Sequence, residues 1–107
     1  MFNEKEIRKI RKAFNETDKN IVGIFKVLSD LNRYRIFRIL SEQPKLSIGN
    51  IAEILEISLP LASQHIKILS QSNLIHKERG GKNVLTKLKH DNPFVPVIIK
   101  TIHEILK

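Results

Sequence analysis

The hydrophobic pattern of residues 47–88 changes twice, and these changes constrain the fold more than any other feature. Two short stripes at helical spacing are separated only by a joint at Ile57-Ser58. Their inner positions are Ile51, Ile54 and Leu55 in the first stripe, and Ala62, Ile66 and Leu69 in the second. Residues 74–88 then alternate partly between apolar and polar side chains around Gly80-Gly81, which predicts a hairpin. The segment therefore predicts two tightly joined helices followed by two paired strands.

The ends of these two helices carry signals of their own. Ser47 and Ser58 stand where an N-cap side chain accepts a backbone N–H of the first turn. Pro60 is tolerated in that turn because the turn needs no internal amide donor. Asn73 holds the position after the second helix at which a left-handed residue is favoured. The second helix is therefore expected between Ser58 and Asn73.

Further helical stripes flank this segment on both sides. The positions are Ile7, Ile10 and Phe14; Ile21, Ile24, Phe25 and Leu28; Tyr34, Ile36, Phe37, Ile39 and Leu40; and, after Asn92-Pro93, Phe94, Val97, Ile98, Ile102, Ile105 and Leu106. Asp30 is a candidate N-cap for the third stripe, and Leu46 lies in a short extended piece. We therefore expect three helices before the central segment and one after it.

This order of elements predicts a mainly α chain with a small β-hairpin wing (α+β), the layout of a winged helix-turn-helix. A length of 107 residues predicts one domain. Within the single domain 1–107, we expect residues 1–29 and 93–107 to form dimerisation helices. Residues 30–90 are expected to form the DNA-binding core and the wing.

Charge and composition narrow the partners and exclude several kinds of site. The formal net charge of +8 favours an anionic partner, either nucleic acid or an acidic membrane surface. The chain has no cysteine, so disulfides, zinc thiolate sites and thiol redox sensing are excluded. No apolar run is long enough to span a membrane, and the charged N-terminal segment lacks the apolar core of a signal peptide. A cytoplasmic protein is expected.

The second helix of a helix-turn-helix lies in the DNA major groove, and its first residues meet base edges. Gln64 has the amide geometry to pair with adenine, Ser63 suits a base or a phosphate, and Lys67 suits a phosphate. Leu59 and Leu61 either pack on thymine methyl groups or complete the core. The predicted contacts on this helix are Ser58, Leu59, Pro60, Leu61, Ser63, Gln64 and Lys67.

The predicted hairpin is strongly basic. Glu78 is the only acid between Ile57 and His90, and Arg79 and Lys82 are the candidate wing contacts to the minor groove or its phosphates. A run of charge also fits an ordinary solvated face, but one-sided charge on both the helix and the wing favours phosphate contact. Ser47 and Asn50 are candidates for additional contacts to the DNA backbone.

Several stretches of this chain resemble the ArsR/SmtB family of winged-helix repressors. They are "LSDLNRYRIFRIL" before the motif, "S-x-H-I-K-I-L" from Ser63 to Leu69, "NLI" where the family usually has "GLV", and "ERGGKNVLTKL" at the wing. The resemblance covers about residues 22–107. It implies a homodimer built from the N- and C-terminal helices, which binds an inverted repeat in a promoter and is often released by an inducer.

The apolar terminal helix supports a dimer independently, because a large exposed apolar face marks an interface. Packing of that helix against the first two helices of the same chain is the alternative, and both arrangements are compatible in a two-fold dimer. The predicted interface residues are Ile7, Ile10, Phe14, Phe94, Val97, Ile98, Ile102 and Ile105.

Many members of the family that this chain resembles sense metals. The paired cysteines of one family site would align near Ser47 and Gly49, so that site is missing. A second family site, on the terminal helix, has only His90, Asp91 and His103 as candidate ligands, too few for a good zinc site. We therefore expect no cofactor, although zinc or another divalent metal stays open at these three residues. No convergent polar pocket for a small-molecule inducer is evident in the sequence.

Other functional classes are less well supported. Ser63 and His65 resemble a nucleophile and a base, but they lack the strand-turn-helix elbow and point in different directions on a helix. His65 is expected to be structural or a phosphate donor, and no catalytic residue is predicted. A winged helix used for protein contact through Leu59 and Leu61, or for nonspecific nucleic-acid binding, is the alternative. Membrane-surface binding is disfavoured because the basic residues lie on a compact motif.

Overall fold

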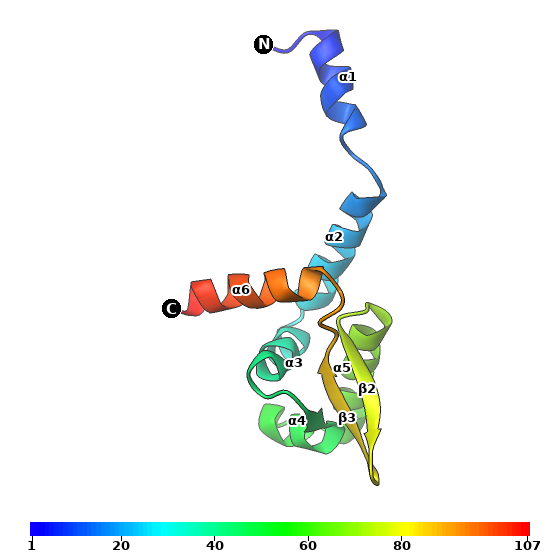
Figure 1. The fold of residues 1–107 in the computed structure, drawn as a ribbon, viewed down its shortest axis with the longest axis vertical. Coiled ribbons are helices and arrows are strands. Elements are labelled where there is room, and N and C mark those ends of the chain that lie inside the picture. Colours follow the sequence, from blue (N-terminus) through cyan, green and yellow to red (C-terminus); the bar gives the residue numbers. More distant parts are fainter.

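The computed structural model describes all of residues 1–107 and contains six helices and a three-stranded antiparallel sheet (Figure 1). The elements are α1 (Glu4–Lys12), α2 (Glu16–Leu28), α3 (Leu31–Glu42), β1 (Leu46–Ser47), α4 (Ile48–Leu55), α5 (Leu59–Gln71), β2 (Ile75–Gly80), β3 (Asn83–Leu88) and α6 (Phe94–Leu106). This order confirms the predicted winged helix-turn-helix.

The core lies between α3, α4, α5, the sheet and the inner side of α6. Its members are apolar and buried: Ile24, Ile36, Phe37, Leu40, Ile51, Ile66, Leu69, Leu74, Ile75, Leu88, Val95 and Ile102. The predicted inner stripe of α5 is confirmed, since Ala62, Ile66 and Leu69 have no exposed surface. At about 1.5–3 kcal/mol for each large side chain, this burial is the main stabilising term of the domain.

The predicted inner face of α4 is partly wrong. Ile51 is buried, but Ile54 is 52% exposed, and Ala52 takes its place in the core. In an eight-residue helix only one narrow face meets the core, and that face is formed by Ile48, Ile51, Ala52 and Leu55. Ile54 is rotated away from the centre of this face, because each residue advances the helix by about 100°.

The turn between α4 and α5 follows from backbone geometry. Glu56 closes α4 in the left-handed region, with φ 55°, and redirects the chain. Ser58 then caps α5, because its Oγ accepts the backbone N–H of Leu61 at 3.2 Å. Pro60 lies in the first turn of α5, as predicted.

The wing is a hairpin whose third strand comes from the start of the helix-turn-helix. The strand order is β1-β3-β2, and Gly80 pairs with Asn83, so that the loop consists of Gly81 and Lys82. The two glycines serve different purposes. Gly81 has φ +65°, whereas a Cβ on Gly80 would lie 2.6 Å from Leu85 Cδ1.

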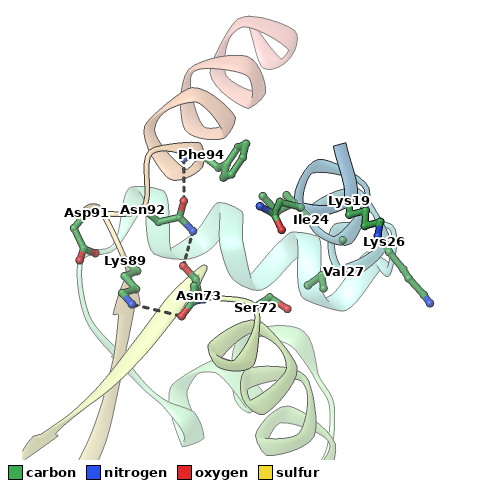
Figure 2. A pocket seen from close by; sticks show the side chains of 12 residues that line it. Lys19, Ile24, Lys26, Val27, Ser72, Asn73, Lys89, Asp91, Asn92 and Phe94 are labelled. Atoms are coloured by element: carbon green, nitrogen blue, oxygen red, sulfur yellow. Dashed lines mark hydrogen bonds between the residues drawn. The ribbon is translucent and has the colours of Figure 1, made fainter. Parts of the chain in front are cut away.

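The end of α5, the end of β3 and the start of α6 meet at a polar junction (Figure 2). Asn73 adopts the predicted left-handed conformation with φ 60°. Its carbonyl oxygen accepts from Asn92 Nδ2 at 2.8 Å, and Asn92 Oδ1 accepts from the backbone N–H of Phe94 at 3.0 Å. Asn92 therefore holds the start of α6 to the residues after α5, and its side chain also accepts a backbone N–H from the first turn of α6.

The N-terminal part of the chain extends away from this body. The molecule measures 61 × 30 × 24 Å, and α1 stands at one extreme of the long axis with no buried residue (Figure 1). In α2, Ile24 alone is buried, and Phe25 is 69% exposed. The helices 1–28 thus have no core of their own. None of the six helices is both long enough and apolar enough to cross a bilayer.

Gly23 offers a test of this description of α2. It lies in mid-helix, and a Cβ at its position would meet no atom within 4 Å. We expect Gly23→Ala to raise the free energy of unfolding by about 0.5–1 kcal/mol, because alanine loses less backbone entropy in a helix. Urea unfolding at fixed protein concentration measures this change. Gly81→Ala, at φ +65°, should instead destabilise. A destabilised Gly23→Ala would show that α2 packs closely at this position.

Candidate nucleic-acid interface

The outward face of α5 carries the predicted base-reading residues. Every one of them is exposed: Ser58, Leu59, Pro60, Leu61, Ser63, Gln64 and Lys67. Leu59 is 55% exposed and Leu61 is 37% exposed, so neither completes the core, as one interpretation of the sequence had it. Because the opposite face of α5 is buried, these side chains form one surface of serine, glutamine, lysine and leucine at the start of the helix.

The wing carries exposed cations. Lys77 and Arg79 alternate with His76 and Glu78 along β2, so they lie on the strand face that also holds the buried Ile75. Farther along, beyond the core, that face is solvent-exposed, and Lys82 follows in the two-residue turn. Strand alternation therefore directs the two cations toward the side of the hairpin that packs on α5.

Glu78, the single acid of this region, is neutralised by two lysines. Lys45 Nζ lies 2.6 Å from Glu78 Oε1, and Lys87 Nζ lies 3.4 Å from Oε2. The hydrogen bond from Lys45 is the main reason that the pKa of Glu78 lies below its ordinary value, and the charges of both lysines act in the same direction. The carboxylate thus ties β2 to β3 and to the loop before β1, and it adds no unpaired negative charge to the surface.

Ser47 and Asn50, predicted to touch the DNA backbone, form a capping box at the start of α4. Asn50 N–H donates to Ser47 Oγ at 3.0 Å, and Ser47 N–H donates to Asn50 Oδ1 at 3.2 Å. Their oxygens are therefore engaged within the chain, and the exposed Asn50 amide keeps its Nδ2 group for an outside acceptor.

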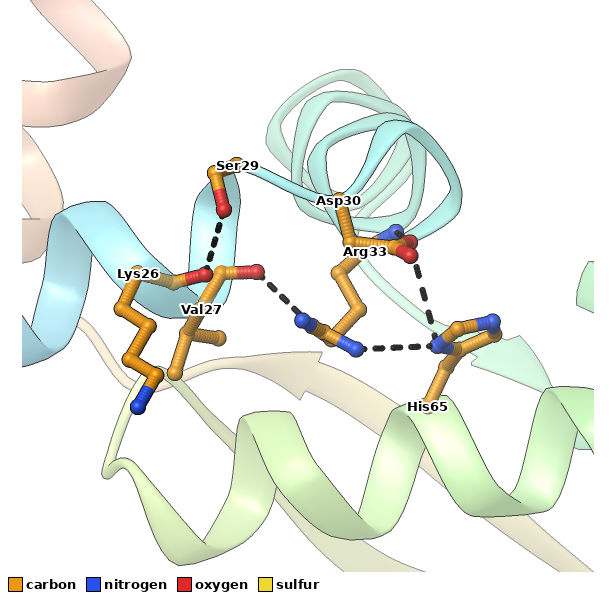
Figure 3. Close-up of polar contacts among 6 residues, drawn as sticks. All are labelled: Lys26, Val27, Ser29, Asp30, Arg33 and His65. Atoms are coloured by element: carbon orange, nitrogen blue, oxygen red, sulfur yellow. Dashed lines mark hydrogen bonds and ion pairs between the residues drawn. The ribbon is translucent and has the colours of Figure 1, made fainter.

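A polar cluster on the inner side of α5 fixes the position of the helix (Figure 3). His65 is 8% exposed, and its Nδ1 lies 3.4 Å from Arg33 Nη1 and 3.9 Å from Asp30 Oδ1. Arg33 Nε also donates to the carbonyl oxygen of Val27 at 2.7 Å. The cluster therefore joins α5 to the start of α3 and the end of α2, which agrees with the structural one of the two roles expected for His65.

Asp30 supports this cluster as the N-cap of α3. Its Oδ1 accepts the backbone N–H of Arg33 at 3.0 Å. That hydrogen bond is the main cause of the lowered pKa of Asp30; the charges of His65 and Arg33 add to it, and partial burial opposes it. Sequence reasoning identified Asp30 only as a cap and overlooked Arg33. Arg33 and His65 are 32 positions apart in the sequence, so no local pattern reveals their contact.

The three candidate metal ligands do not assemble within one protomer. No group of three or more His, Asp or Glu side chains in the structure could hold a metal ion. His90 and Asp91 are exposed in the loop before α6, whereas His103 Nε2 lies 3.5 Å from Ser41 Oγ. The expectation that the chain takes no metal stays a prediction.

Comparison with known proteins agrees with this geometry. The helix-turn-helix domain family matches residues 28–78. The transcriptional repressor SdpR of Bacillus subtilis is 35% identical over 66 residues, which are 62% of this chain and 72% of SdpR. The cadmium resistance regulatory protein CadC of Listeria innocua is 30% identical over 79 residues, which are 74% of this chain and 66% of CadC.

The chain belongs to the ArsR/SmtB family of winged helix-turn-helix regulators. The fold of this ArsR/SmtB chain also matches that of HlyU from Vibrio cholerae, with a TM-score of 0.78 at 23% identity, over 86% of this chain and 97% of HlyU. The aligned segment is just under two thirds of the length of CadC.

The cluster at Asp30 predicts a defined pH dependence of stability in this ArsR/SmtB chain. Because the folded-state pKa of Asp30 is lowered, its charge stabilises the fold above the ordinary value of 3.8, and this stabilisation is lost as the pH falls through the folded-state pKa. Asp30→Asn keeps an N-cap but removes the charge. We expect urea unfolding to show a lower free energy of unfolding for the variant than for the wild type at pH 7. In acid the two free energies should become equal.

Asp30→Ala separates the cap from the charge. It should lose a further ~1 kcal/mol relative to Asp30→Asn at every pH, because the N-cap hydrogen bond is missing. Equal stability of the wild type and Asp30→Asn at pH 7 would contradict the electrostatic role of Asp30.

Proposed function

We propose that this chain is a cytoplasmic, sequence-specific DNA-binding transcriptional regulator. In this proposal it acts as a repressor, binds an inverted-repeat promoter site as a homodimer and has no catalytic role. The observation that carries the proposal is the exposed face of serine, glutamine, lysine and leucine on α5 beside a cationic wing whose single acid is already paired with lysines.

The exposed face of α5 fits the chemistry of the major groove. Gln64 offers both a donor and an acceptor, which is the pattern required by adenine N7 and N6. Leu59 and Leu61 are apolar and exposed at the start of the helix, where they fit thymine methyl groups. Ser63 and Lys67 flank them and suit phosphates or base edges.

The wing supplies contacts that do not depend on base sequence. Arg79 and Lys82 are exposed near the turn, and a two-residue loop with glycine in it approaches a phosphate backbone closely. The net charge of +8 adds a long-range attraction. In this division, α5 gives specificity and the wing gives general affinity.

The homodimer is supported by apolar surface that one protomer leaves uncovered. Among the predicted interface residues, Ile102 is buried within the protomer, and Phe94 and Ile98 are half-buried. The others remain exposed: Ile7, Ile10, Phe14, Val97 and Ile105. A second copy related by a two-fold axis would cover α1 and the outer face of α6, and it would place two α5 helices for two half-sites.

A second candidate function is a protein contact through the start of α5. Exposure of Leu59 and Leu61 favours it, because paired exposed leucines also suit an apolar partner. The cationic wing favours DNA instead.

Two substitutions test the division of labour on DNA. Gln64→Ala should weaken binding to the chain's own promoter by about 1–3 kcal/mol and leave binding to a scrambled duplex unchanged. Lys82→Ala should weaken binding to both duplexes alike. It should also reduce the salt dependence of the affinity by about one phosphate contact. Fluorescence anisotropy at several salt concentrations measures both effects.

Weak binding to both duplexes without preference would contradict the proposed DNA function and favour the protein contact. If the two variants instead lost affinity equally on both duplexes, the assignment of Gln64 to base reading would be wrong.

A charge on the outer face of α6 tests the dimer. Ile105 is 76% exposed, so Ile105→Glu should leave the protomer folded but disrupt an interface that buries this side chain. Sedimentation equilibrium should show a monomer, and promoter affinity should fall because one half-site is lost. Ile54→Glu, at a 52% exposed position on α4, is the matched control and should remain dimeric. A dimeric Ile105→Glu would place the interface elsewhere.

A further inference from the structure

A hollow of about 710 Å³ lies between α2, the end of α5, the loop after β3 and the start of α6 (Figure 2). Sites for small organic ligands usually measure about 300–1,000 Å³. None of the residues proposed to read DNA lines this hollow, and none of the candidate interface residues except Phe94 does. The proposed function therefore leaves the hollow unexplained.

The lining of the hollow is cationic. Lys19 and Lys26 line the hollow from α2, with the Lys26 side chain extending outward from the helix, Lys89 lies on the opposite side, and Asp91 is the single carboxylate. Lys19 pairs with Glu16 at 3.2 Å, whereas Lys26 and Lys89 form no ion pair. Unpaired ammonium groups around a concave site attract an anion.

Neutral donors complete the polar side of the hollow. Lys89 Nζ lies 3.5 Å from Asn73 Oδ1, so the amide of Asn73 points its oxygen toward the lysine and leaves Nδ2 as a donor. Asn20 lines the hollow from α2 and brings a second amide. Ammonium and amide N–H groups are good partners for carboxylate or phosphate oxygens.

The remaining part of the lining is apolar. Ile24, Val27 and Phe94 line the hollow, and the ring of Phe94 faces Ile24 across it (Figure 2). Inorganic ions would leave this part uncovered, whereas a ligand with a hydrocarbon or aromatic body would bury it. The lining thus matches a molecule that is anionic at one end and apolar at the other.

We propose that this hollow binds a small organic anion, a carboxylate or phosphate group on an apolar body, and that binding weakens the affinity for DNA. The regulatory half of this inference rests on the proposed function. The ligand class follows from the lining alone.

The position of the hollow explains how the two sites are coupled. Asn73 follows α5, Lys89 follows β3 and Asn92 precedes α6, and all three line the hollow and bond to one another. An anion that draws Lys89 away from Asn73 would alter the junction between the DNA-reading elements and the dimer helices. It also adds negative charge to a protein that binds DNA. By linkage, DNA must then weaken the binding of the anion by the same factor.

The ligand site is tested first on the free protein. The isotope-labelled full chain is titrated with benzoate and with phenyl phosphate, which distinguish a carboxylate from a phosphate, at constant ionic strength. We expect saturable NMR shifts of the backbone amides of Asn73, Lys89 and Asn92 with at least one of the two. Benzamide, which lacks the charge, should give none, and inorganic phosphate should bind more weakly. Absence of saturable shifts with both anions, or equal shifts with benzamide, would overturn the inference.

Gly23 provides a matched pair of variants. It lines the hollow from α2, and no atom lies within 4 Å of a Cβ at its position. Gly23→Leu should fold, because leucine favours a helix over glycine, and should occupy the part of the hollow beside α2 and weaken binding strongly. Gly23→Ala adds only a methyl group and should bind as the wild type does. Equal binding by all three would overturn the assignment to this hollow.

A second pair tests the charge. Lys89→Gln should weaken binding roughly fivefold, the effect of losing one partly exposed ion pair. Lys100→Gln removes the same charge from an exposed position of α6 outside the hollow and should change nothing. An equal effect of both variants would show a nonspecific ionic attraction and contradict the site.

Regulation is then measured by promoter anisotropy with and without the anion that binds. We expect the anion to weaken DNA binding by the wild type and Gly23→Ala but not by Gly23→Leu. Promoter affinity that is unchanged by a bound anion would overturn the regulatory half of the inference. Saturable anion binding by a chain with no preference for promoter DNA would contradict the proposed function and leave the ligand site standing. Specific DNA binding without anion binding would contradict the ligand site and leave the proposed function standing.

Discussion

The burial of one face of α5 determines which side chains this chain presents to a partner. Ala62, Ile66 and Leu69 have no exposed surface, and α5 packs against α3, whose Ile36 and Phe37 are equally buried. Rotating α5 to present another face would expose these apolar side chains, at a cost of about 1.5–3 kcal/mol for each large one. The exposed face therefore keeps the residues proposed to read bases because the opposite face is committed to the core.

Apolar packing fixes the rotation of α5 about its axis more firmly than it fixes the tilt of that axis. The polar cluster at His65 restrains the tilt. Arg33 reaches both the end of α2 and the imidazole on α5, while Asp30 caps α3 beside them. Since buried polar groups must be satisfied, any tilt of α5 that breaks these contacts leaves the side chain of His65 without its partners Arg33 and Asp30. The helix proposed to read DNA is thus held by apolar contacts on one side and by a specific polar cluster near its middle.

The elements of this fold were predictable from sequence because local rules set them. Ser47, Ser58 and Asp30 cap helices where expected, and Asn73 is left-handed, since each of these positions depends only on neighbouring residues. Ile54 was misplaced because in a short helix the periodicity alone does not define which side faces the core. The contact of Arg33 with His65 and the hollow between α2 and α6 involve residues far apart in the chain, so they could not be inferred without the fold. Exposure of Pro60, Ser63, Gln64 and Lys67 was predicted, whereas that of Leu59 and Leu61 was left open, and the roles of all these residues remain predictions.

The molecule combines a well-packed body with an extended N-terminal part, and the hollow lies where the two join. On the body side, the side chains of Asn73, Lys89 and Asn92 make three hydrogen bonds of 2.8 to 3.5 Å above the buried Leu74, Leu88 and Val95. Polar contacts of this kind exchange with solvent or with a ligand at a small net cost, whereas packed apolar contacts do not. The proposed regulation requires the placement of α5 to change relative to α6, and a polar joint would permit such a change. In the proposed ligand binding, Lys89 and Asn73 would act both as donors to the anion and as part of this joint, so the same contacts would link the ligand to the placement of α5.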